Sequence, residues 1–116
     1  MPHPDHSWLA DILMAARKIR GIAAGLSREE FQSDELRVLA IERLITILGE
    51  AAKQVSQEFR SRHPEIPWRQ MAGMRDLVIH AYRTIDEDEV WKAISISIPT
   101  LIANLEPLVP PMNDDA

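Results

Sequence analysis

The sequence contains no cysteine, which excludes disulfide bonds and thiolate chemistry. Aromatic residues make up only 5% of its 116 residues, and Leu, Ile and Ala dominate the apolar set, a mixture that favours packed helices over a β-sandwich. No apolar run approaches the roughly 20 residues of a membrane span, and residues 1–6 lack the basic and apolar regions of a signal peptide. These absences predict a soluble, cytoplasmic, helical domain without a membrane segment.

The chain also lacks the sequence patterns of common metal and phosphate sites. It has no His-Glu-x-x-His or Glu-x-x-His pair, as found in zinc proteases and di-iron bundles, and no glycine-rich phosphate loop. We therefore expect no metal and no cofactor, so that any catalysis would depend on side chains alone. The formal net charge of −5 argues against broad, salt-driven binding of nucleic acid. An RNA site would have to be a local basic cleft on an acidic body.

Length and composition predict one domain. A chain of this size with 46% hydrophobic residues can bury a single core. We assign residues 1–106 to this domain and residues 107–116 to a loose, proline-rich and acidic tail. Helical periodicity predicts an all-α bundle of four to five helices with a kink in the last one.

The first helix is expected to begin near Asp5 or Ser7, because both are good N-caps. Apolar residues recur at helical spacing to about Ala24, and Gly25 is a natural residue to follow the helix end. Ser27 then opens a Ser-Arg-Glu-Glu capping box, which predicts a brief further turn of helix.

The second long helix is expected to begin after Ser33 or Asp34 and to continue to Phe59 or Arg60. Its apolar residues form two neighbouring stripes: Leu36, Leu39, Leu44, Ile47, Leu48, Ala51 and Val55 in one, and Val38, Ile41, Ile45 and Ala52 in the other. A helix that is apolar over so much of its circumference packs on more than one neighbour. It is our candidate for the central helix, and a second subunit could share it.

A new helix can start at Pro67, since proline suits the first helical turn. Gly73 is expected to interrupt it, and a third main helix is expected from Arg75 to about Tyr82. This second part contains the candidate functional residues.

Residues 86–89 (Asp-Glu-Asp-Glu) form another capping box, so a fresh helix is expected to start at Asp86. Pro99 should kink this helix, because proline lacks the N–H donor and clashes with the preceding turn. Residues 94–98 (Ile-Ser-Ile-Ser-Ile) alternate as a strand would, but the helical pattern on both sides favours helix.

Residues 74–83 contain Arg75, His80 and Tyr82, spaced Arg-x4-His-x-Tyr. A histidine can transfer protons, an arginine can hold a phosphate, and a tyrosine adds an uncharged hydroxyl, so the three suffice for metal-free cleavage of RNA. On a straight helix Arg75 and Tyr82 lie within about 20° of each other, whereas His80 lies about 140° from Arg75. The three converge only if the helix ends or loosens near His80, or if a two-fold dimer brings a second copy opposite the first.

Each of these residues also has a structural interpretation. Arg75 could form an ion pair with Asp76 or another surface acid, and His80 follows three aliphatic residues and could be a hydrogen-bonded core histidine. The large side chains of Trp68 and Trp91 are more typical of a core or an interface than of a base-stacking platform.

Two residues of the central helix are weaker candidates. Glu50 and Lys53 are three residues apart and could form a salt bridge on the helix surface. Their functional interpretation is as support for the residues that line a catalytic cleft.

With these segments placed, nearly the whole chain resembles the HepT family, the toxin half of bacterial HepT/MNT toxin–antitoxin pairs, within the HEPN superfamily of helical ribonucleases. The similarity lies in seven segments in the same order: residues 25–31 (Gly-Leu-Ser-Arg-Glu-Glu-Phe), 47–53 (Ile-Leu-Gly-Glu-Ala-Ala-Lys), 63–68 (His-Pro-Glu-Ile-Pro-Trp), 73–75 (Gly-Met-Arg), 80–82 (His-Ala-Tyr), 85–86 (Ile-Asp) and 90–91 (Val-Trp). Many ordered segments are far more specific than three motif residues.

The resemblance implies an antiparallel helical bundle that forms a homodimer, with a composite cleft where two Arg-x4-His motifs meet. It implies RNA cleavage without metal. DNA lacks the 2′-hydroxyl that such cleavage uses, so we expect RNA and not DNA as substrate. It also implies neutralisation by an MNT-type nucleotidyltransferase antitoxin that uses ATP to adenylylate the motif tyrosine, here Tyr82. One position departs from the family, because the residue after the arginine is commonly asparagine and here is Asp76. A carboxylate there could pair with Arg75 and lower the positive potential offered to phosphate.

The sequence therefore leads to two functional hypotheses. The first is a metal-independent endoribonuclease toxin in which His80 and Arg75 act on the RNA phosphodiester. The alternative, suggested by Asp76 and the acidic net charge, is a non-catalytic helical dimer that binds a nucleotidyltransferase.

Overall fold

The computed structural model describes residues 5–80 and 87–109, except for the side chains of residues 75–80 and 87. The regular secondary structure of the described residues is entirely helical. The elements are α1 (Asp5–Ala23), α2 (Arg28–Gln32), α3 (Glu35–Gln54), α4 (Gln57–Arg62), α5 (Trp68–His80), α6 (Glu87–Lys92), the π-helical turn η1 (Ala93–Ser97), α7 (Ile98–Leu105) and the 3₁₀ turn η2 (Glu106–Leu108). The predicted all-α class is confirmed.

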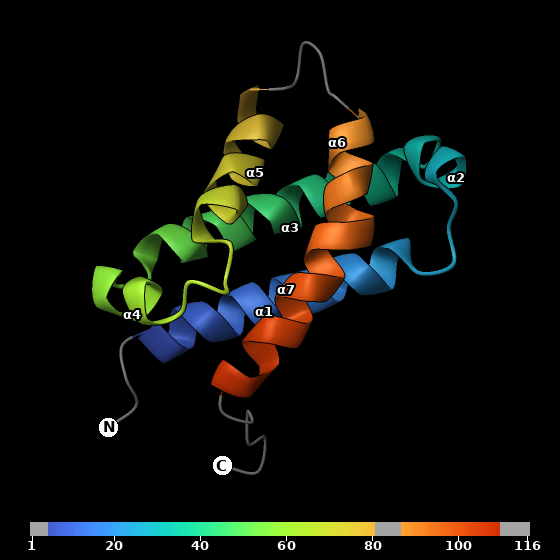
Figure 1. The fold of residues 1–116 in the computed structure, drawn as a ribbon. Helices are drawn as coiled ribbons and strands as arrows, with labels where there is room; N and C mark the ends of the chain where they lie inside the picture. The colour runs from blue at the N-terminus through green and yellow to red at the C-terminus, as the bar shows by residue number, and fades with distance from the viewer. Residues whose placement is uncertain (1–4, 81–86, 110–116) are drawn as a thin grey trace.

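Two antiparallel pairs of long helical segments build the bundle (Figure 1). α1 and α3 run side by side in opposite directions, and α5 and the segment α6–η1–α7 also run in opposite directions across them. α3 packs against α1 and α5 and also contacts α2, while α7 packs on α1. The expected central position of the second long helix is therefore confirmed.

One apolar cluster joins these helices. Its largest fully buried side chains are Leu9, Ile12, Ile19, Ile41, Ile45, Leu48, Ile66, Met71, Ile98, Leu101, Ile102 and Leu105. Burying a side chain of this size contributes roughly 1.5–3 kcal/mol, so the cluster is the main source of stability that opposes the entropy cost of folding. Leu36 and Leu39, at the start of α3, remain 80% and 53% exposed and lie outside it.

The first turns follow the sequence closely. α1 ends at Ala23, and Gly25 takes a φ of 77°, the left-handed conformation that glycine adopts without steric cost. The capping box at Ser27 forms as expected: its side chain accepts from the backbone N–H of Glu30, and the Glu30 side chain accepts from the backbone N–H of Ser27.

The second long helix ends earlier than predicted. α3 stops at Gln54, because Val55 turns to an extended conformation (φ −65°, ψ 137°) and Ser56 becomes the N-cap of the separate helix α4. Ser56 is held there by the buried carboxylate of Asp5, which accepts from its backbone N–H at 2.8 Å and from its hydroxyl at 2.6 Å. Our expectation of a continuous helix to Phe59 or Arg60 was wrong, since this distant contact favours the break.

The expected interruption at Gly73 is also wrong. α5 is one continuous helix from Trp68 to His80. The buried side chains of Met71 and Met74 anchor this helix on both sides of the glycine. Tertiary packing thus outweighs the cost of about 1 kcal/mol for glycine inside a helix.

Around Pro99 the last long segment departs from α-helical geometry through the π-helical turn η1, in which the backbone N–H of Ile98 donates to the carbonyl of Ala93. Pro99 then falls in the first turn of α7, where a missing N–H is tolerated. Helix is confirmed over strand for residues 94–98. The predicted start at Asp86 lies outside the described residues, and α6 is described from Glu87.

The chain remains packed beyond residue 106. Leu108 and Val109 lie against the core, so the bundle includes the first residues that we assigned to the tail, while residues 110–116 lie outside the described part. No described helix combines the length and apolar character needed to cross a membrane.

Candidate active site

The motif arginine and histidine lie on α5, which keeps its helical geometry through His80. Arg75 and His80 are five positions apart on this α-helix, which places them about 140° apart around the helix axis and about 7.5 Å apart along it. The structure therefore positions these two residues on different faces of one helix. The side chains of Arg75, Asp76 and His80, and all of Tyr82, lie outside what the structure describes.

Packing fixes where α5 lies. Its buried Met71 and Met74 sit in the core shared with α3, and its first turn begins after Pro67, whose carbonyl accepts from the backbone N–H of Met71 at 3.0 Å. This packing fixes the direction of α5 and hence the backbone positions of Arg75 and His80.

The helix α6, which follows residues 81–86, is held by contacts with α2. Arg28 forms an ion pair with Asp88 at 2.5 Å, and the rings of Phe31 and Trp91 pack with centroids 5.4 Å apart. Trp91 is half-buried against the core, consistent with the packing interpretation of this residue. These contacts fix the start of α6 relative to α2.

Glu50 and Lys53 line a hollow of about 460 Å³ between α1 and α3, together with Trp8 and Asp11 of α1. Both are exposed, and each makes a polar or electrostatic interaction. The supporting role that we assigned them toward Arg75 and His80 stays a prediction.

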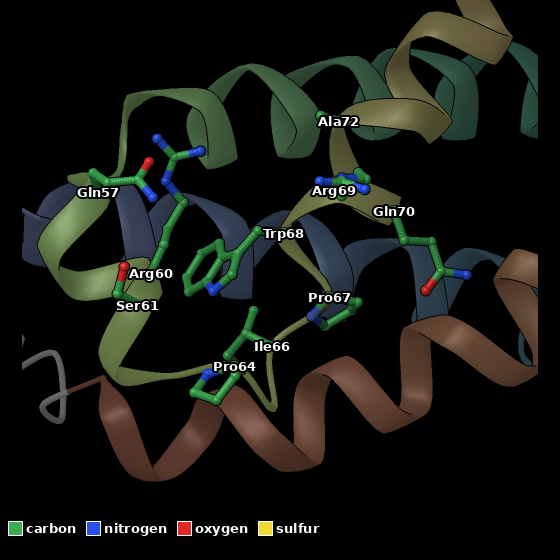
Figure 2. Close-up of a pocket in the computed structure, with 10 residues that line it drawn as sticks. All are labelled: Gln57, Arg60, Ser61, Pro64, Ile66, Pro67, Trp68, Arg69, Gln70 and Ala72. Atoms are coloured by element: carbon green, nitrogen blue, oxygen red, sulfur yellow. The ribbon is translucent and has the colours of Figure 1, made fainter.

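A larger hollow, of about 760 Å³, lies between α4 and the first turn of α5 (Figure 2). Arg60 of α4 extends beside the indole ring of Trp68, and Arg69 follows at the start of α5. Trp68 is held from two directions: its indole N–H donates to the carbonyl of His63 at 2.9 Å, and its ring meets Phe59 edge-on at 6.2 Å. Its packing interpretation from the sequence agrees with these contacts.

We call this hollow the α4–α5 groove, and its electrostatics differ from those of the whole chain. Its lining includes Arg60 and Arg69 but neither an aspartate nor a glutamate. No ion pair among the described residues engages either arginine, and the Nε atom of Arg60 is buried without a hydrogen-bond partner there.

The acids nearest to the groove in sequence are engaged elsewhere. Glu58 forms an ion pair with Arg62. Glu65 hydrogen-bonds to the His63 ring at 2.8 Å, and this bond lowers the pKa of the Glu65 carboxyl. Because the whole chain is acidic, an RNA site on it has to be a local basic region, and the α4–α5 groove is such a region. Its two arginines were missed in the sequence, where a signal existed only as two basic residues flanking a Pro-x-x-Pro-Trp turn.

No group of three or more His, Cys, Asp or Glu side chains within the described residues is arranged to hold a metal ion. The lining of the α4–α5 groove offers arginine guanidinium groups, glutamine amides and a serine hydroxyl.

Comparison with known proteins identifies the family. The family model for ribonuclease HepT-like proteins matches residues 12–108. A Thermococcus cleftensis protein named "Probable ribonuclease HepT" is 38% identical over 108 residues, which cover 93% of this chain and 98% of that protein.

Two further relatives extend the similarity. A protein of Caldanaerobacter subterraneus named as an RNase is 36% identical over 94 residues, 81% of this chain and 84% of its own. Another, from Methanocaldococcus jannaschii and also named as an RNase, is 32% identical over 110 residues, 94% of this chain and 95% of its own. No solved structure matches the chain. The family match spans the core helices and the stretch with Arg75, His80 and Tyr82, and the chain belongs to the HepT-like ribonuclease family.

Proposed function

We propose that this protein is a metal-independent endoribonuclease that acts as the toxin of a toxin–antitoxin pair. The observation that supports this most directly is the family match over residues 12–108, which includes the complete Arg-x4-His-x-Tyr motif. RNA is the substrate class, since relatives over more than nine-tenths of the chain are named as ribonucleases.

In the proposed reaction the ribose 2′-oxygen attacks the adjacent phosphorus while the bond from phosphorus to the 5′-oxygen breaks. His80 takes the proton from the 2′-hydroxyl or, as imidazolium, gives one to the departing 5′-oxygen. Arg75 holds the phosphate and stabilises the extra negative charge of the phosphorane. The products are a 2′,3′-cyclic phosphate and a 5′-hydroxyl.

The proposed active site is formed by two copies of the chain. Arg75 and His80 sit about 140° apart on one continuous helix, so one copy does not direct both toward a single phosphate through helix geometry alone. A two-fold dimer places the α5 helices of both subunits opposite each other and lets an arginine of one subunit complement a histidine of the other.

The direct test is incubation of purified protein with RNA in excess EDTA. Cleavage should persist in EDTA and leave 2′,3′-cyclic phosphate ends, and the matching DNA should remain intact because it lacks the 2′-hydroxyl. Loss of cleavage in EDTA, or consumption of DNA, would refute the mechanism.

Growth on induction separates this function from the alternative of a non-catalytic dimer that binds a nucleotidyltransferase. That alternative is favoured by Asp76, a carboxylate next to the motif arginine, and by the net charge of −5. A catalytic toxin should slow growth when expressed alone, and His80→Ala should relieve the effect with the fold and dimer unchanged. Equal toxicity of parent and variant would rule out catalysis by His80.

We further propose that an MNT-type nucleotidyltransferase neutralises the protein by attaching AMP from ATP to Tyr82. The added phosphodiester would face the RNA phosphate in the cleft. At about 5 Å and an effective dielectric of about 20, two such charges repel by about 3 kcal/mol. Co-expression with such an enzyme, followed by peptide mass spectrometry, should place AMP on Tyr82 in the parent and none on Tyr82→Phe. AMP on another residue would show that Tyr82 is not the switch.

A further inference from the structure

We propose that the α4–α5 groove is a second contact site for the RNA substrate, in which Arg60 and Arg69 bind a backbone phosphate a few nucleotides from the scissile bond. The proposal rests on the ribonuclease function proposed above and extends it from the reacting phosphate to the flanking strand.

Helix geometry connects the groove to the proposed active site. Arg69 and His80 are eleven residues apart on the continuous helix α5, which places them within about 20° of each other around the axis and about 16 Å apart along it. Gly73 lies between them on the same side, exposed and with open space where a side chain would project. Gly73 puts no side chain in the way of an extended strand that follows this side of α5 from His80 to the groove. Asp76, seven residues after Arg69, lies on the same side of the helix, so the strand would pass this carboxylate before it reaches the two arginines.

The groove has the chemistry to hold such a strand. Arg60 and Arg69 supply two cations that no described carboxylate neutralises. The side chains of Gln57, Ser61 and Gln70 add polar groups to its lining. Single-stranded nucleic acid is commonly bound by such a positively charged groove that tracks the backbone, with an aromatic side chain beside it.

Trp68 gives the groove a rigid apolar wall. Its ring is fixed by the hydrogen bond to the His63 carbonyl and by the edge contact with Phe59. Because these same contacts pack the α4–α5 turn, replacing Trp68 would disturb the fold. The arginines are the better positions for a test, since Arg69 is exposed and Arg60 is half-buried at the rim.

The test measures RNA binding apart from cleavage. A fluorescein-labelled oligouridylate is titrated, by fluorescence anisotropy at several salt concentrations, with His80→Ala protein and with the same protein also carrying Arg60→Gln and Arg69→Gln. The added pair should weaken binding roughly tenfold at low salt. It should also reduce the slope of log affinity against log salt by about 1.4, as expected for two lost charge contacts with a single strand.

A matched control removes two charges elsewhere. Lys18→Gln with Arg20→Gln changes the net charge equally at two exposed positions of α1, and it should leave affinity and slope close to those of the parent. Equal losses in both double variants would mean that net charge alone is responsible and would overturn the proposal. So would parental affinity in the groove variant, or loss of its dimer in light scattering.

A cleavage assay separates this proposal from the function on which it rests. A dinucleotide has only the scissile phosphate and cannot reach Arg69, so the groove variant with His80 intact should cleave it at the parental rate. On a longer oligouridylate the same variant should show a raised KM with kcat unchanged. If the parent cleaves neither substrate, the proposed function fails, and the binding result still decides whether the groove holds RNA.

A protein partner is the remaining outcome. If the groove variant binds RNA as the parent does but no longer copurifies with a co-expressed nucleotidyltransferase, the groove is a protein-docking site and the proposal is wrong.

Discussion

The carboxylate of Asp5 accepts two hydrogen bonds from Ser56, 51 residues further along the chain, one from its backbone N–H and one from its hydroxyl. The same hydroxyl accepts from the backbone N–H of Phe59 at 3.2 Å, so Ser56 caps α4 while it is bound to the first turn of α1. This contact connects the start of the bundle to the α3–α4 break and hence to the α4–α5 groove.

Asp5→Asn should lower the free energy of unfolding by about 2 kcal/mol, because it removes the charge from two hydrogen bonds of a side chain that is only 3% exposed. Urea denaturation followed by circular dichroism measures the effect. Asp11→Asn makes the same chemical change on the same helix, without such a contact to Ser56, and should change the unfolding free energy by less than about 0.5 kcal/mol. Similar losses in both variants would contradict a specific role for the Asp5–Ser56 contact.

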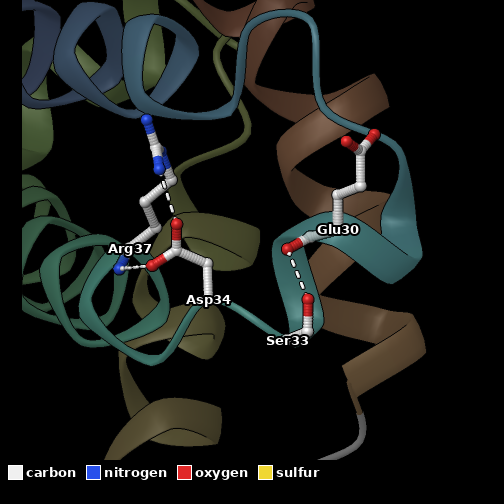
Figure 3. A network of polar contacts seen from close by, with 4 residues as sticks. All are labelled: Glu30, Ser33, Asp34 and Arg37. Carbon is white, nitrogen blue, oxygen red and sulfur yellow. Dashed lines mark hydrogen bonds and ion pairs between the residues drawn. The ribbon is translucent and has the colours of Figure 1, made fainter.

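The cap of α3 should make stability depend on acid pH. Asp34 accepts from the backbone N–H of Arg37 at 3.1 Å and pairs with its guanidinium at 2.5 Å (Figure 3). The hydrogen bond to the Arg37 side chain, followed by the bond to its backbone, lowers the pKa of Asp34 below the ordinary 3.8.

Because this pKa is lower in the folded chain, the contribution of Asp34 to stability is complete above pH 3.8 and is lost as the pH falls through the folded-state value. Asp34→Asn keeps a good N-cap but cannot titrate. The Tm difference between parent and variant should therefore shrink as the pH falls below the usual aspartate range. A constant difference across that range would show that the ion pair does not contribute.

Gly73→Ala should raise stability by about 1 kcal/mol, because alanine is the better helix former and the added Cβ meets open space. If an RNA strand follows this side of α5, the same methyl group should raise the KM for long RNA. Gly21→Ala is the control: it lies in α1, also with open space around the added Cβ, and should stabilise the fold without changing cleavage. Unchanged kinetics in both variants would mean that RNA does not approach Gly73 closely.

A mixing experiment tests the composite active site. Arg75→Ala and His80→Ala proteins should each be inactive, whereas refolding an equimolar mixture should restore about a quarter of the parental activity. Half of the dimers in the mixture contain one chain of each kind, and each of these has one of the two arginine–histidine pairs of a parental dimer. Native mass spectrometry verifies that mixed dimers form. Mixed dimers without activity would show that the pair does not act across subunits.

Local signals predicted much of the fold. The capping box at Ser27 and the left-handed Gly25 depend on residues close in sequence, and the structure confirms them. The apolar stripes of α3 are confirmed apart from Leu36 and Leu39 in the first stripe, which are exposed. The two wrong boundaries, at Gln54 and at Gly73, depend on contacts that sequence spacing does not encode, namely the carboxylate of Asp5 and the core that surrounds Met71 and Met74.

The candidate site divides in the same way. The Arg-x4-His-x-Tyr motif could be found because its three residues lie within a short stretch of sequence. The α4–α5 groove could not, because Arg60 and Arg69 come together only when the turn between them folds around Trp68. The angle of about 140° between Arg75 and His80 follows from the sequence once α5 is known to be continuous to His80.

The π-helical turn η1 sets the rotational phase between the two ends of the last long segment. A π-helical turn holds more residues than an α-helical one, so deleting one residue from Ala93–Ser97 would restore an α-helical register. Such a deletion would leave α6 and α7 in nearly the same rotational phase. The same residues in continuous α-helical geometry would instead carry one residue too many, which would rotate α6 by about 100° relative to α7 and turn Trp91 away from Phe31. The π-helical turn therefore accommodates one extra residue in the last long segment while Trp91 keeps its contact with Phe31.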